Sequence, residues 1–329
     1  MDTALVIGGT RFIGRHTVAE LRDHGYDVAI FNRGEHDNPF ADTAVEHVRG
    51  DRTDDADLAD AARAVSPDVV IDCVAYRPRE VRTATRVFDD ADAYVYVSSG
   101  AAYGEEAIPK REGETALCLC SDEQATDDSN ASYGPRKAEG DRAVFDAAAE
   151  GVRAMSVRPC NVYGPHDYTG RVDYWIERVS NHDRVLVPGD GTNVWHRAYV
   201  EDVAAALRFV AENGDSGEAY NVGDRRATTL DELVGGIATV LGESVETVHA
   251  GSRELAAGDI DTDDFPLYRY YPHLLSTTKL ARLGWESTPH AEALAATVDE
   301  YVESDRDGYE HGPDREDEAR VLNVLDTLV

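Results

Sequence analysis

The stretch Ala4-Leu5-Val6-Ile7-Gly8-Gly9-Thr10-Arg11-Phe12-Ile13-Gly14 decides the fold. Its first four residues form a short apolar run, which is typical of a strand buried on both faces of a parallel sheet. A glycine turn follows, and apolar residues at helical spacing from Phe12 to Leu21 indicate a helix that ends near Gly25. This order can direct backbone N–H groups and a positive helix end at the pyrophosphate of a dinucleotide. Because Arg11 stands where a middle glycine is usual, the spacing also fits a tight strand-to-helix turn without a ligand.

The order of strand and helix repeats along the chain. Apolar runs indicate strands at 28–31, 45–48, 69–71, 93–97, 152–157, 186–188 and 219–223. Helices are expected at 54–65, 133–149, 175–179, 195–210, 230–241 and 314–328, with Thr229 as the cap of the helix at 230. The stretches 279–285 and 290–302 are expected as the last packed elements before a charged linker. This alternation predicts an α/β fold: a Rossmann-type doubly wound parallel sheet with a smaller mixed C-terminal substrate lobe.

The expected division of the chain follows from these elements. The dinucleotide-binding Rossmann domain spans 1–165 and receives the chain again at about 197–223. The substrate-binding lobe is formed by 166–196 and 224–310, and 311–329 is a C-terminal docking helix. The apolar stripe of that helix consists of Val321, Leu322, Leu325 and Leu328. The stretch 105–132 is polar and loop-like, and we expect it to be a mobile flap beside the site.

The composition is strongly acidic. Among 329 residues, 64 acidic and 32 basic side chains give a formal charge of −32, which argues against binding nucleic acid or anionic membrane through a general basic surface. Lysine occurs only at Lys110, Lys137 and Lys279. This balance is typical of the cytoplasm of a salt-loving archaeon, where a hydrated acidic surface keeps proteins soluble in concentrated salt.

Targeting and redox signals are weak. No apolar run approaches the ~18 residues of a membrane span, and no basic segment leads into a signal core, so we expect a cytoplasmic protein. The four cysteines are too few and too irregularly spaced for a disulfide framework. The pair Cys118 and Cys120 lacks nearby ligand partners, so we expect no metal.

The end of the second strand bears on the choice of cofactor. An acidic side chain there would bind the ribose hydroxyls of NAD, but Asn32 and Arg33 follow the strand instead. Arg33 can pair with the 2′-phosphate of NADP, and Arg11 can close over the same phosphate, so NADP is slightly favoured over NAD. Alternatively, both arginines are solvated or contact only the pyrophosphate. Asp51 and Arg52, after the third strand, suit the adenine edge.

Tyr133 and Lys137 carry the candidate chemistry. Four residues apart, they share one face of the expected helix, with Ser132 as its N-cap and Pro135 in its first turn. A neighbouring ammonium favours the phenolate, and lowering a tyrosine pKa from about 10 toward neutrality takes roughly 4 kcal/mol. Tyr133 would then be usable as a proton shuttle. The alternative is an ordinary surface tyrosine and lysine on an amphipathic helix.

The motifs together resemble the extended and atypical short-chain dehydrogenase/reductases, the NAD(P)-dependent epimerase/dehydratase family, over about 3–302. The resemblance rests on the glycine turn at 8–14, Ser98-Ser99 with Tyr103-Gly104, Tyr133 with Lys137, and the stretches 158–165, 199–203, 220–223 and 283–285. It implies that Ser99 holds the substrate oxygen, that Tyr133 passes the proton, and that Lys137 lowers the tyrosine pKa and binds the nicotinamide ribose. It also implies a homodimer through the helix that carries Tyr133 and the helix before it.

Two sets of candidate site residues result. The cofactor set comprises Gly8, Thr10, Arg11, Phe12, Ile13, Gly14, Asn32, Arg33, Asp51, Arg52, Val74, Ala75, Ser98, Tyr133, Lys137, Pro159 and Val162. The substrate set comprises Ser99, Gly100, Tyr103, Asn161, His166, Trp195 and His196. For Tyr103 and for both histidines, a structural role is the alternative.

Departures from the family pattern restrict the activity. Relatives that remove water from a sugar carry an Asp-Glu pair directly after the catalytic serine or threonine, where this chain has Gly100-Ala101, so dehydration is disfavoured. Relatives that act on nucleotide sugars commonly have an arginine for the diphosphate where Trp195 stands, although His196 or Arg197 could compensate.

We therefore expect an active NAD(P)-dependent oxidoreductase or epimerase on a nucleotide sugar or another small polar hydroxyl or carbonyl substrate. The alternative is a cofactor-binding regulatory or RNA-associated member without turnover, since some atypical members resemble the chloroplast stem-loop RNA-binding branch. The acidic charge opposes contact with RNA.

Overall fold

The computed structural model describes residues 2–328 in two compact units. The first unit comprises the chain up to Val162, then Ala198–Gly223 and Leu275–Ser287. The second comprises Tyr163–Arg197, Asp224–Leu274 and the chain from Thr288. The chain therefore passes between the units five times, and each unit is assembled from segments that are distant in sequence.

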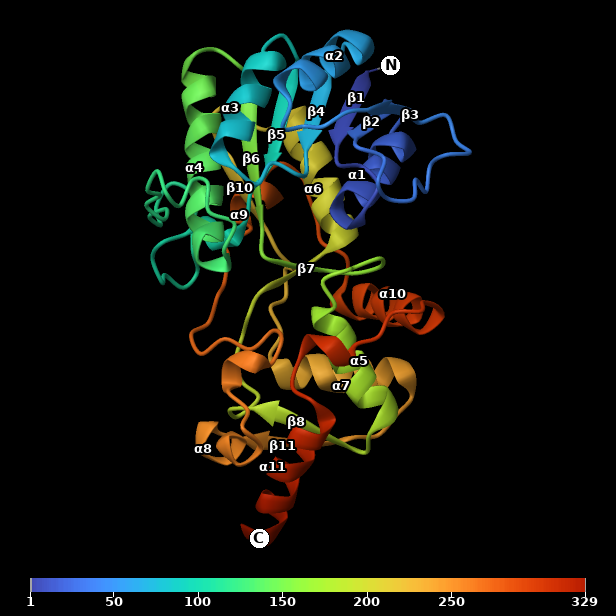
Figure 1. Cartoon of the computed structure of the whole chain (residues 1–329), viewed down its shortest axis with the longest axis vertical. Helices are drawn as coiled ribbons and strands as arrows, with labels where there is room; N and C mark the ends of the chain where they lie inside the picture. The colour runs from blue at the N-terminus through green and yellow to red at the C-terminus, as the bar shows by residue number, and fades with distance from the viewer. Residues whose placement is uncertain (1, 329) are drawn as a thin grey trace. The chain divides into compact units, whose positions relative to one another are not determined.

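A seven-stranded parallel sheet forms the first unit (Figure 1). Its strands lie in the order β10-β6-β5-β4-β1-β2-β3. Their bounds are Ala219–Val222 (β10), Ala154–Pro159 (β6), Ala93–Val97 (β5), Val69–Asp72 (β4), Thr3–Ile7 (β1), Asp27–Asn32 (β2) and Glu46–Arg49 (β3). The order reverses between β1 and β4, where Ile7 pairs with both Phe31 and Asp72. This topology confirms the predicted Rossmann-type fold class.

Helices cover the sheet because its strands are apolar on both faces. Side chains that alternate along the strands, among them Leu5, Ile7 and Phe31, pack with α2 (Asp55–Val65), α3 (Pro78–Val87) and α4 (Asn130–Ala149). The residues between them in β1, Ala4 and Val6, are equally buried and point to the opposite face. In addition, α1 (Phe12–Asp23) packs against α6 (Val200–Asn213), and α3 packs against α4.

Two glycines shape the turn between β1 and α1. Gly8 has a φ of +91°, which favours glycine, and a Cβ on it would lie 2.5 Å from Cγ1 of Val74. A Cβ on Gly14 would collide with the carbonyl oxygen of Gly8. The amino end of α1 can therefore approach the end of β1 only because both positions lack a side chain.

Helix α4 differs from the expectation at its start. It begins at Asn130 with Ser129 as N-cap, so Ser132 is not the cap and Pro135 lies inside the helix. The reason is local: the carboxylate of Asp127 accepts the hydroxyl of Ser132 at 2.6 Å and the backbone N–H of Ser129 at 3.2 Å. These bonds draw the preceding chain into the first turn and move the boundary by three residues.

Other boundaries also differ from those expected. Arg197–Tyr199 is a strand (β9), so α6 starts at Val200 and not at 195. Strand β6 starts at Ala154, and α9 is limited to Thr278–Ala281. The helix α3 and the strand β11 (Glu246–Ala250) were not expected. Both are short elements whose burial comes from neighbours distant in sequence.

The second unit combines a small parallel strand pair with helices. Strand β8 (Arg184–Pro188) pairs with β11, and α7 (Leu230–Leu241) packs against α5 (Arg171–Asn181) and α10 (His290–Glu303). Thr229 caps α7 as predicted, accepting the N–H of Glu232 at 3.1 Å in a capping box. Short helical turns, among them α8 (Ser252–Leu255), fill the stretch after β11.

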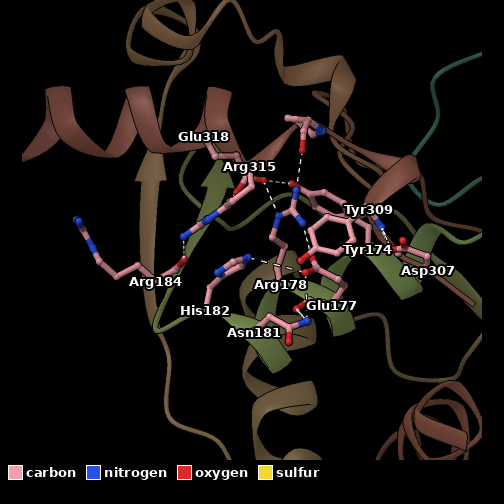
Figure 2. A network of polar contacts seen from close by, with 12 residues as sticks. Tyr174, Glu177, Arg178, Asn181, His182, Arg184, Asp307, Tyr309, Arg315 and Glu318 are labelled. Carbon is pink, nitrogen blue, oxygen red and sulfur yellow. Dashed lines mark hydrogen bonds and ion pairs between the residues drawn. The ribbon is translucent and has the colours of Figure 1, made fainter.

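The C-terminal helix is α11 (Arg315–Leu328), and it docks within the second unit. Of the expected stripe, Val321 and Leu322 are buried and Leu325 is half-buried, whereas the side chain of Leu328 lies outside the described part. A buried charged network supplements this small apolar contact (Figure 2). It joins Tyr174, Glu177 and Arg178 of α5 to Pro313, Arg315 and Glu318.

Two further stretches differ from the expected organisation. Leu275–Ser287 belongs to the first unit and not to the second, because Ser276 donates to the carbonyl of Lys110 at 2.9 Å and Trp285 donates to the carbonyl of Asp202 at 3.0 Å. The expected flap at 105–132 is irregular, but its first half is fastened to the first unit. Lys110 is 1% exposed, and Cys118 donates its N–H to the carbonyl of Ala102 at 2.8 Å.

Candidate active site

The ammonium group of Lys137 is buried in the first unit and bound to two backbone carbonyls. Its side chain is buried on α4, and Nζ donates to the carbonyl oxygens of Ala75 at 2.9 Å and Val97 at 2.8 Å. Val97 is the last residue of β5, and Ala75 lies three residues after the end of β4, one of the two strands between which the strand order reverses. Two of three ammonium donors are thus used to fix the lysine at the edge where such sheets bind ligands.

Three tyrosine rings surround the ammonium. The ring centres of Tyr96, Tyr76 and Tyr133 lie 4.8, 5.3 and 5.9 Å from Nζ of Lys137. Ring faces attract a cation and compensate part of the hydration that burial removes. Burial nevertheless lowers the pKa of Lys137 to about 8, although the carboxylates of Asp72 and Asp141 oppose this shift. The lysine consequently changes charge near neutral pH.

Ser99 lies in a turn that packs on the same helix. Its half-buried hydroxyl accepts the N–H of Ala101 at 3.1 Å, in the 3₁₀ turn Gly100–Ala102. A Cβ on Gly134 would lie 2.5 Å from the carbonyl oxygen of Ala101, so the turn contacts α4 directly beside Tyr133. The structure thereby brings the Ser99 turn, Tyr133 and Lys137 together at one corner of the first unit.

Tyr103 is held by hydrogen bonds within the first unit, as expected for the structural alternative that the sequence left open. Its ring is buried, and its hydroxyl donates to Oδ1 of Asn221 at 2.8 Å and accepts from Nη1 of Arg158 at 3.0 Å. Arg158 in turn donates to Asp141 at 2.8 Å. Burial raises the pKa of Tyr103, and both its polar partners are provided by the protein.

Arginine and histidine side chains lie near the end of β2, although the chain as a whole is strongly acidic. Nη1 of Arg11 lies 3.3 Å from Nε2 of His36, and Arg33 forms an exposed ion pair with Glu35. Asn32 accepts the N–H of Gly34 at 2.8 Å and lies 3.0 Å from Nε2 of His47. The side chain of Arg49 lies against Gly34. Three arginines and two histidines therefore lie around this turn, together with Glu35 and Asp37 of the same stretch and with Asp51, whose pKa the charge of Arg33 helps to lower.

Two of the candidate residues, Arg52 and Ser98, have buried polar side-chain atoms. Arg52 is buried and paired with Asp72, which also accepts the hydroxyl of Tyr94 at 3.0 Å. Within residues 2–328, Nε and Nη1 of Arg52 and the hydroxyl of Ser98 are buried without a hydrogen-bond partner. Since buried polar atoms are normally paired, these atoms fit a bound group that brings its own acceptors. The carboxylate of Asp51 instead accepts two hydrogen bonds from Thr53, which lower its pKa.

The other cofactor candidates lie in the same unit. Arg11 is the N-cap of α1 and makes no capping bond with its side chain, and the first turn contains no acidic residue. The backbone N–H groups of this end can therefore receive an anion. Thr10, Phe12 and Ile13 occupy this turn, Val74 follows β4, Pro159 ends β6, and Val162 lies in β7 (Asn161–Tyr163).

The substrate candidates are divided between the units. Ser99, Gly100, Tyr103 and Asn161 belong to the first unit, and His166, Trp195 and His196 belong to the second. His196 is buried with Nε2 2.7 Å from the carbonyl oxygen of Asp224, and burial lowers its pKa. Arg197 is buried and donates to the carbonyl of Thr228 at 3.1 Å. Both side chains thus have hydrogen-bond partners within the protein, and the suggestion that one of them compensates for the missing arginine stays a prediction.

Sequence reasoning missed two charged residues of the second unit. The guanidinium carbon of Arg269 lies 5.8 Å from the ring centre of Trp195. The carboxylate of Glu300 lies 3.1 Å from Nδ1 of His166. Neither residue belongs to a recognisable motif, and only long-range packing brings each beside its partner.

No helix within residues 2–328 has the length and apolarity that a membrane span requires. The same residues contain no group of three or more His, Cys, Asp or Glu side chains that could hold a metal ion.

Residues 4–223 match the family model described as the NAD dependent epimerase/dehydratase family. The chain belongs to this family. Among curated members, the low-salt glycan biosynthesis protein Agl12 of Haloferax volcanii is 27% identical, and the match covers 92% of this chain and 99% of that protein. A putative UDP-glucose 4-epimerase of Methanocaldococcus jannaschii is 28% identical over 86% of this chain and 92% of its own.

A third relative has a name that refers to binding and not to a reaction. The chloroplast stem-loop binding protein of 41 kDa b of Arabidopsis thaliana is 27% identical, with coverage of 90% of this chain and 78% of that protein. Among solved structures, UDP-glucose 4-epimerase from Thermotoga maritima with UDP-glucose is 22% identical, with a TM-score of 0.70 and coverage of 92% and 99%. The dTDP-glucose 4,6-dehydratase of Bacillus anthracis in complex with NAD is 20% identical, with a TM-score of 0.72 and coverage of 93% and 98%. These two structures share the fold.

Proposed function

We propose that this family member is an active NAD(P)-dependent epimerase or oxidoreductase that acts on a nucleotide sugar, with Ser99, Tyr133 and Lys137 as its catalytic residues. The observation that carries the proposal is the buried ammonium of Lys137, which the carbonyl oxygens of Ala75 and Val97 hold 5.9 Å from the ring centre of Tyr133. The names of the relatives support the substrate class, since several refer to UDP-glucose or dTDP-glucose.

Each residue then has a defined task. When bound at the carboxyl ends of β1 and β4, the nicotinamide cofactor supplies hydride transfer. Lys137 directs its remaining N–H at the cofactor ribose and stabilises the phenolate of Tyr133 electrostatically. Tyr133 holds the proton that is exchanged with the substrate oxygen, and Ser99 donates a hydrogen bond to that oxygen. Gly100 and Ala101 carry no acid or base, so loss of water from the sugar is disfavoured.

A substrate panel tests the proposed function. Enzyme in concentrated KCl is incubated with NAD or NADP and with UDP-glucose, UDP-galactose, dTDP-glucose or UDP-glucuronic acid, and the products are separated by chromatography. We expect turnover of at least one nucleotide sugar and its loss by about 10²-fold in Ser99→Ala, because one oxygen-binding donor is removed. Equal turnover by Ser99→Ala would contradict the assignment of this serine.

The cations at the end of β2 favour NADP as the cofactor. Arg33→Ala should weaken NADPH binding by roughly 10- to 100-fold, which corresponds to one charged hydrogen bond, and leave NADH binding unchanged. Fluorescence titration at constant salt measures both affinities. The matched control is Arg63→Ala, which removes an exposed, paired arginine from α2. An equal loss for the two cofactors would place Arg33 at the pyrophosphate or in solvent.

The lowered pKa of Lys137 predicts how cofactor binding depends on pH. Below about pH 8 the lysine is an ammonium, and above it the charge that supports the ribose contact is lost. Affinity for NADH should therefore fall by about tenfold from about pH 7 to about pH 9.5. In Lys137→Met the affinity should be low at both pH values. A wild-type affinity that does not change across this range would show that the ammonium does not support binding.

A second candidate function is binding of RNA without turnover, which the similarity to the chloroplast stem-loop binding protein favours. The charge of −32 opposes it. Filter binding of a stem-loop RNA at several salt concentrations separates the candidates, because real phosphate contacts weaken steeply as salt rises. The homodimer expected through α3 and α4 stays a prediction, which gel filtration with light scattering can test.

A further inference from the structure

Asp72, the last residue of β4, carries a fully buried carboxylate. This carboxylate accepts hydrogen bonds from the guanidinium of Arg52, from the hydroxyl of Tyr94 at 3.0 Å and from the N–H of Val74 at 3.3 Å. A buried carboxylate is costly unless it is paired with a cation and hydrogen-bonded. The three donors compensate this cost and fix the position of the carboxylate.

The register of the sheet puts this carboxylate near Lys137. Asp72 pairs with Tyr96 of β5, and paired residues of neighbouring strands project from the same face. The ring centre of Tyr96 lies 4.8 Å from Nζ of Lys137, and α3 and α4 pack side by side over this face (Figure 1). Ala75, whose carbonyl binds Nζ, follows Asp72 by three residues. One short turn therefore carries both the carboxylate and an acceptor of the ammonium.

Arg52 and Lys137 approach the carboxylate from opposite directions along the sheet. Arg52 follows β3, at one edge, whereas Nζ of Lys137 binds the carbonyl of Val97 at the end of β5. Strand β4 lies between β5 and β3 in the sheet order, so the carboxylate of Asp72 lies between the two cations. Coulomb energy falls with distance, and the attraction of Lys137 to the nearer carboxylate therefore exceeds its repulsion from the farther guanidinium.

Other charged and titratable groups also face Lys137. Glu80 lies in the first turn of α3, where its carboxylate accepts two backbone N–H groups at 2.8 and 3.1 Å. Asp141 lies one turn further along α4 and accepts from Arg158 at 2.8 Å. The remaining groups are the thiol of Cys73 and the phenols of Tyr76, Tyr96 and Tyr133. Among all these groups, Asp72 does most to oppose the lowering of the Lys137 pKa by burial.

We propose that Asp72 is a positioning residue that keeps Lys137 charged at neutral pH, and that Arg52 and Tyr94 hold its carboxylate in place. The inference rests on the proposed function, because the charge of Lys137 is taken to support the cofactor ribose and the phenolate of Tyr133. All of these protein groups belong to the first unit. Asp72 is assigned no contact with cofactor or substrate and acts only through Lys137.

The first test needs neither cofactor nor substrate. Lysine labelled with ¹³C at Cε gives NMR signals only from Lys110, Lys137 and Lys279, and Lys137→Met assigns the signal in question. We expect the midpoint of the Lys137 titration near pH 8 in the wild type and lower by about one unit or more in Asp72→Asn. The reason is that a neutral amide replaces the carboxylate that favours the ammonium. Unchanged signals of Lys110 and Lys279 report that the fold is intact.

A double variant decides the case in which Asp72→Asn leaves Arg52 as an unpaired buried cation and does not fold. Asp72→Asn combined with Arg52→Met removes both charges, and the Lys137 midpoint should again lie below that of the wild type, since the nearer charge dominates. The matched control Asp89→Asn removes an exposed carboxylate that follows α3 and should leave the midpoint in place.

A wild-type midpoint in Asp72→Asn, or in the double variant where the single variant does not fold, would overturn the inference. A shift of the same size in Asp89→Asn would also overturn it, because overall charge and not this carboxylate would then be responsible.

The second test measures cofactor affinity as a function of pH. NADH is titrated by fluorescence into the wild type, Asp72→Asn and Asp89→Asn from about pH 6 to about pH 9.5 at constant salt. The affinity of Asp72→Asn should fall by about tenfold over this range, as expected for the wild type, with a midpoint about one unit lower. The variant should therefore bind more weakly near pH 7.5 and within about twofold of the wild type at both ends of the range.

The shape of this profile separates a positioning role from a purely structural one. If Asp72→Asn lost the same affinity at every pH, Asp72 would support only the fold and the proposal would be overturned. A wild type that binds neither NADH nor NADPH would contradict the proposed function, whereas an unchanged Lys137 midpoint contradicts only this inference.

Discussion

Tyr133→Phe is expected to lower kcat of the proposed reaction by about 10²- to 10⁴-fold, the usual contribution of a positioned acid–base group. The substitution removes a single oxygen and keeps the ring beside Lys137, so the packing around Nζ is preserved. The rate falls because the hydroxyl to which the proton exchange is assigned is gone. Of its neighbours in sequence motifs, Ser99 accepts a backbone N–H in a tight turn, and Tyr103 is bound between Asn221 and Arg158.

Cofactor affinity separates this loss from misfolding. NADH should bind Tyr133→Phe within about threefold of the wild type, because the ribose contact belongs to Lys137. Tyr76→Phe is the matched control: its ring also lies near Nζ, at 5.3 Å, and it should keep most of the activity. If Tyr133→Phe turned over substrate at the wild-type rate, the Ser-Tyr-Lys assignment would be wrong and only a nucleotide-binding fold would remain.

Arg178→Met is expected to destabilise the protein by about 3–5 kcal/mol, because it leaves buried carboxylates without their cation. The guanidinium of Arg178 is 1% exposed and donates to Glu318 at 2.8 Å, to the carbonyl of Pro313 at 2.7 Å and to Glu177. Glu318, fully buried, also accepts from Tyr174 and from Arg315 at 2.6 Å. The side chain of Met fills a similar volume but provides no donor.

Chemical unfolding at constant KCl concentration measures this effect. Arg320→Met provides the control on α11, since it removes an arginine that is half exposed and paired with Asp317, and such pairs contribute at most about 1 kcal/mol. A double variant, Arg178→Met with Glu318→Leu, should recover part of the stability because an apolar pair replaces the buried charges. A loss below about 1 kcal/mol in Arg178→Met would mean that the network of Figure 2 is solvated in solution.

Local patterns in the sequence were sufficient for the main elements of the first unit. The apolar run of β1, the glycine turn and the start of α1 depend on contacts within a few residues, and Gly8 and Gly14 have the steric reason that the pattern implied. The cap of α7 at Thr229 is equally local. The four-residue spacing of Tyr133 and Lys137 put them on one helix face irrespective of where α4 begins, so the error of three residues in its start had no consequence.

The sequence by itself determined the fold class, most of the strands and helices of the first unit, and the helix face that Tyr133 and Lys137 share. All of these follow from periodicity, glycine positions and spacing along one helix. Only the tertiary structure showed that Tyr103, His196 and Arg197 are buried and hydrogen-bonded within the protein. It alone showed that Lys137 is held by the carbonyls of Ala75 and Val97, and that the carboxylate of Glu300 lies 3.1 Å from Nδ1 of His166. The physical reason is that burial and hydrogen-bond partners are set by residues from 28 to 134 positions away in the chain. No pattern within one segment of the chain records such a contact.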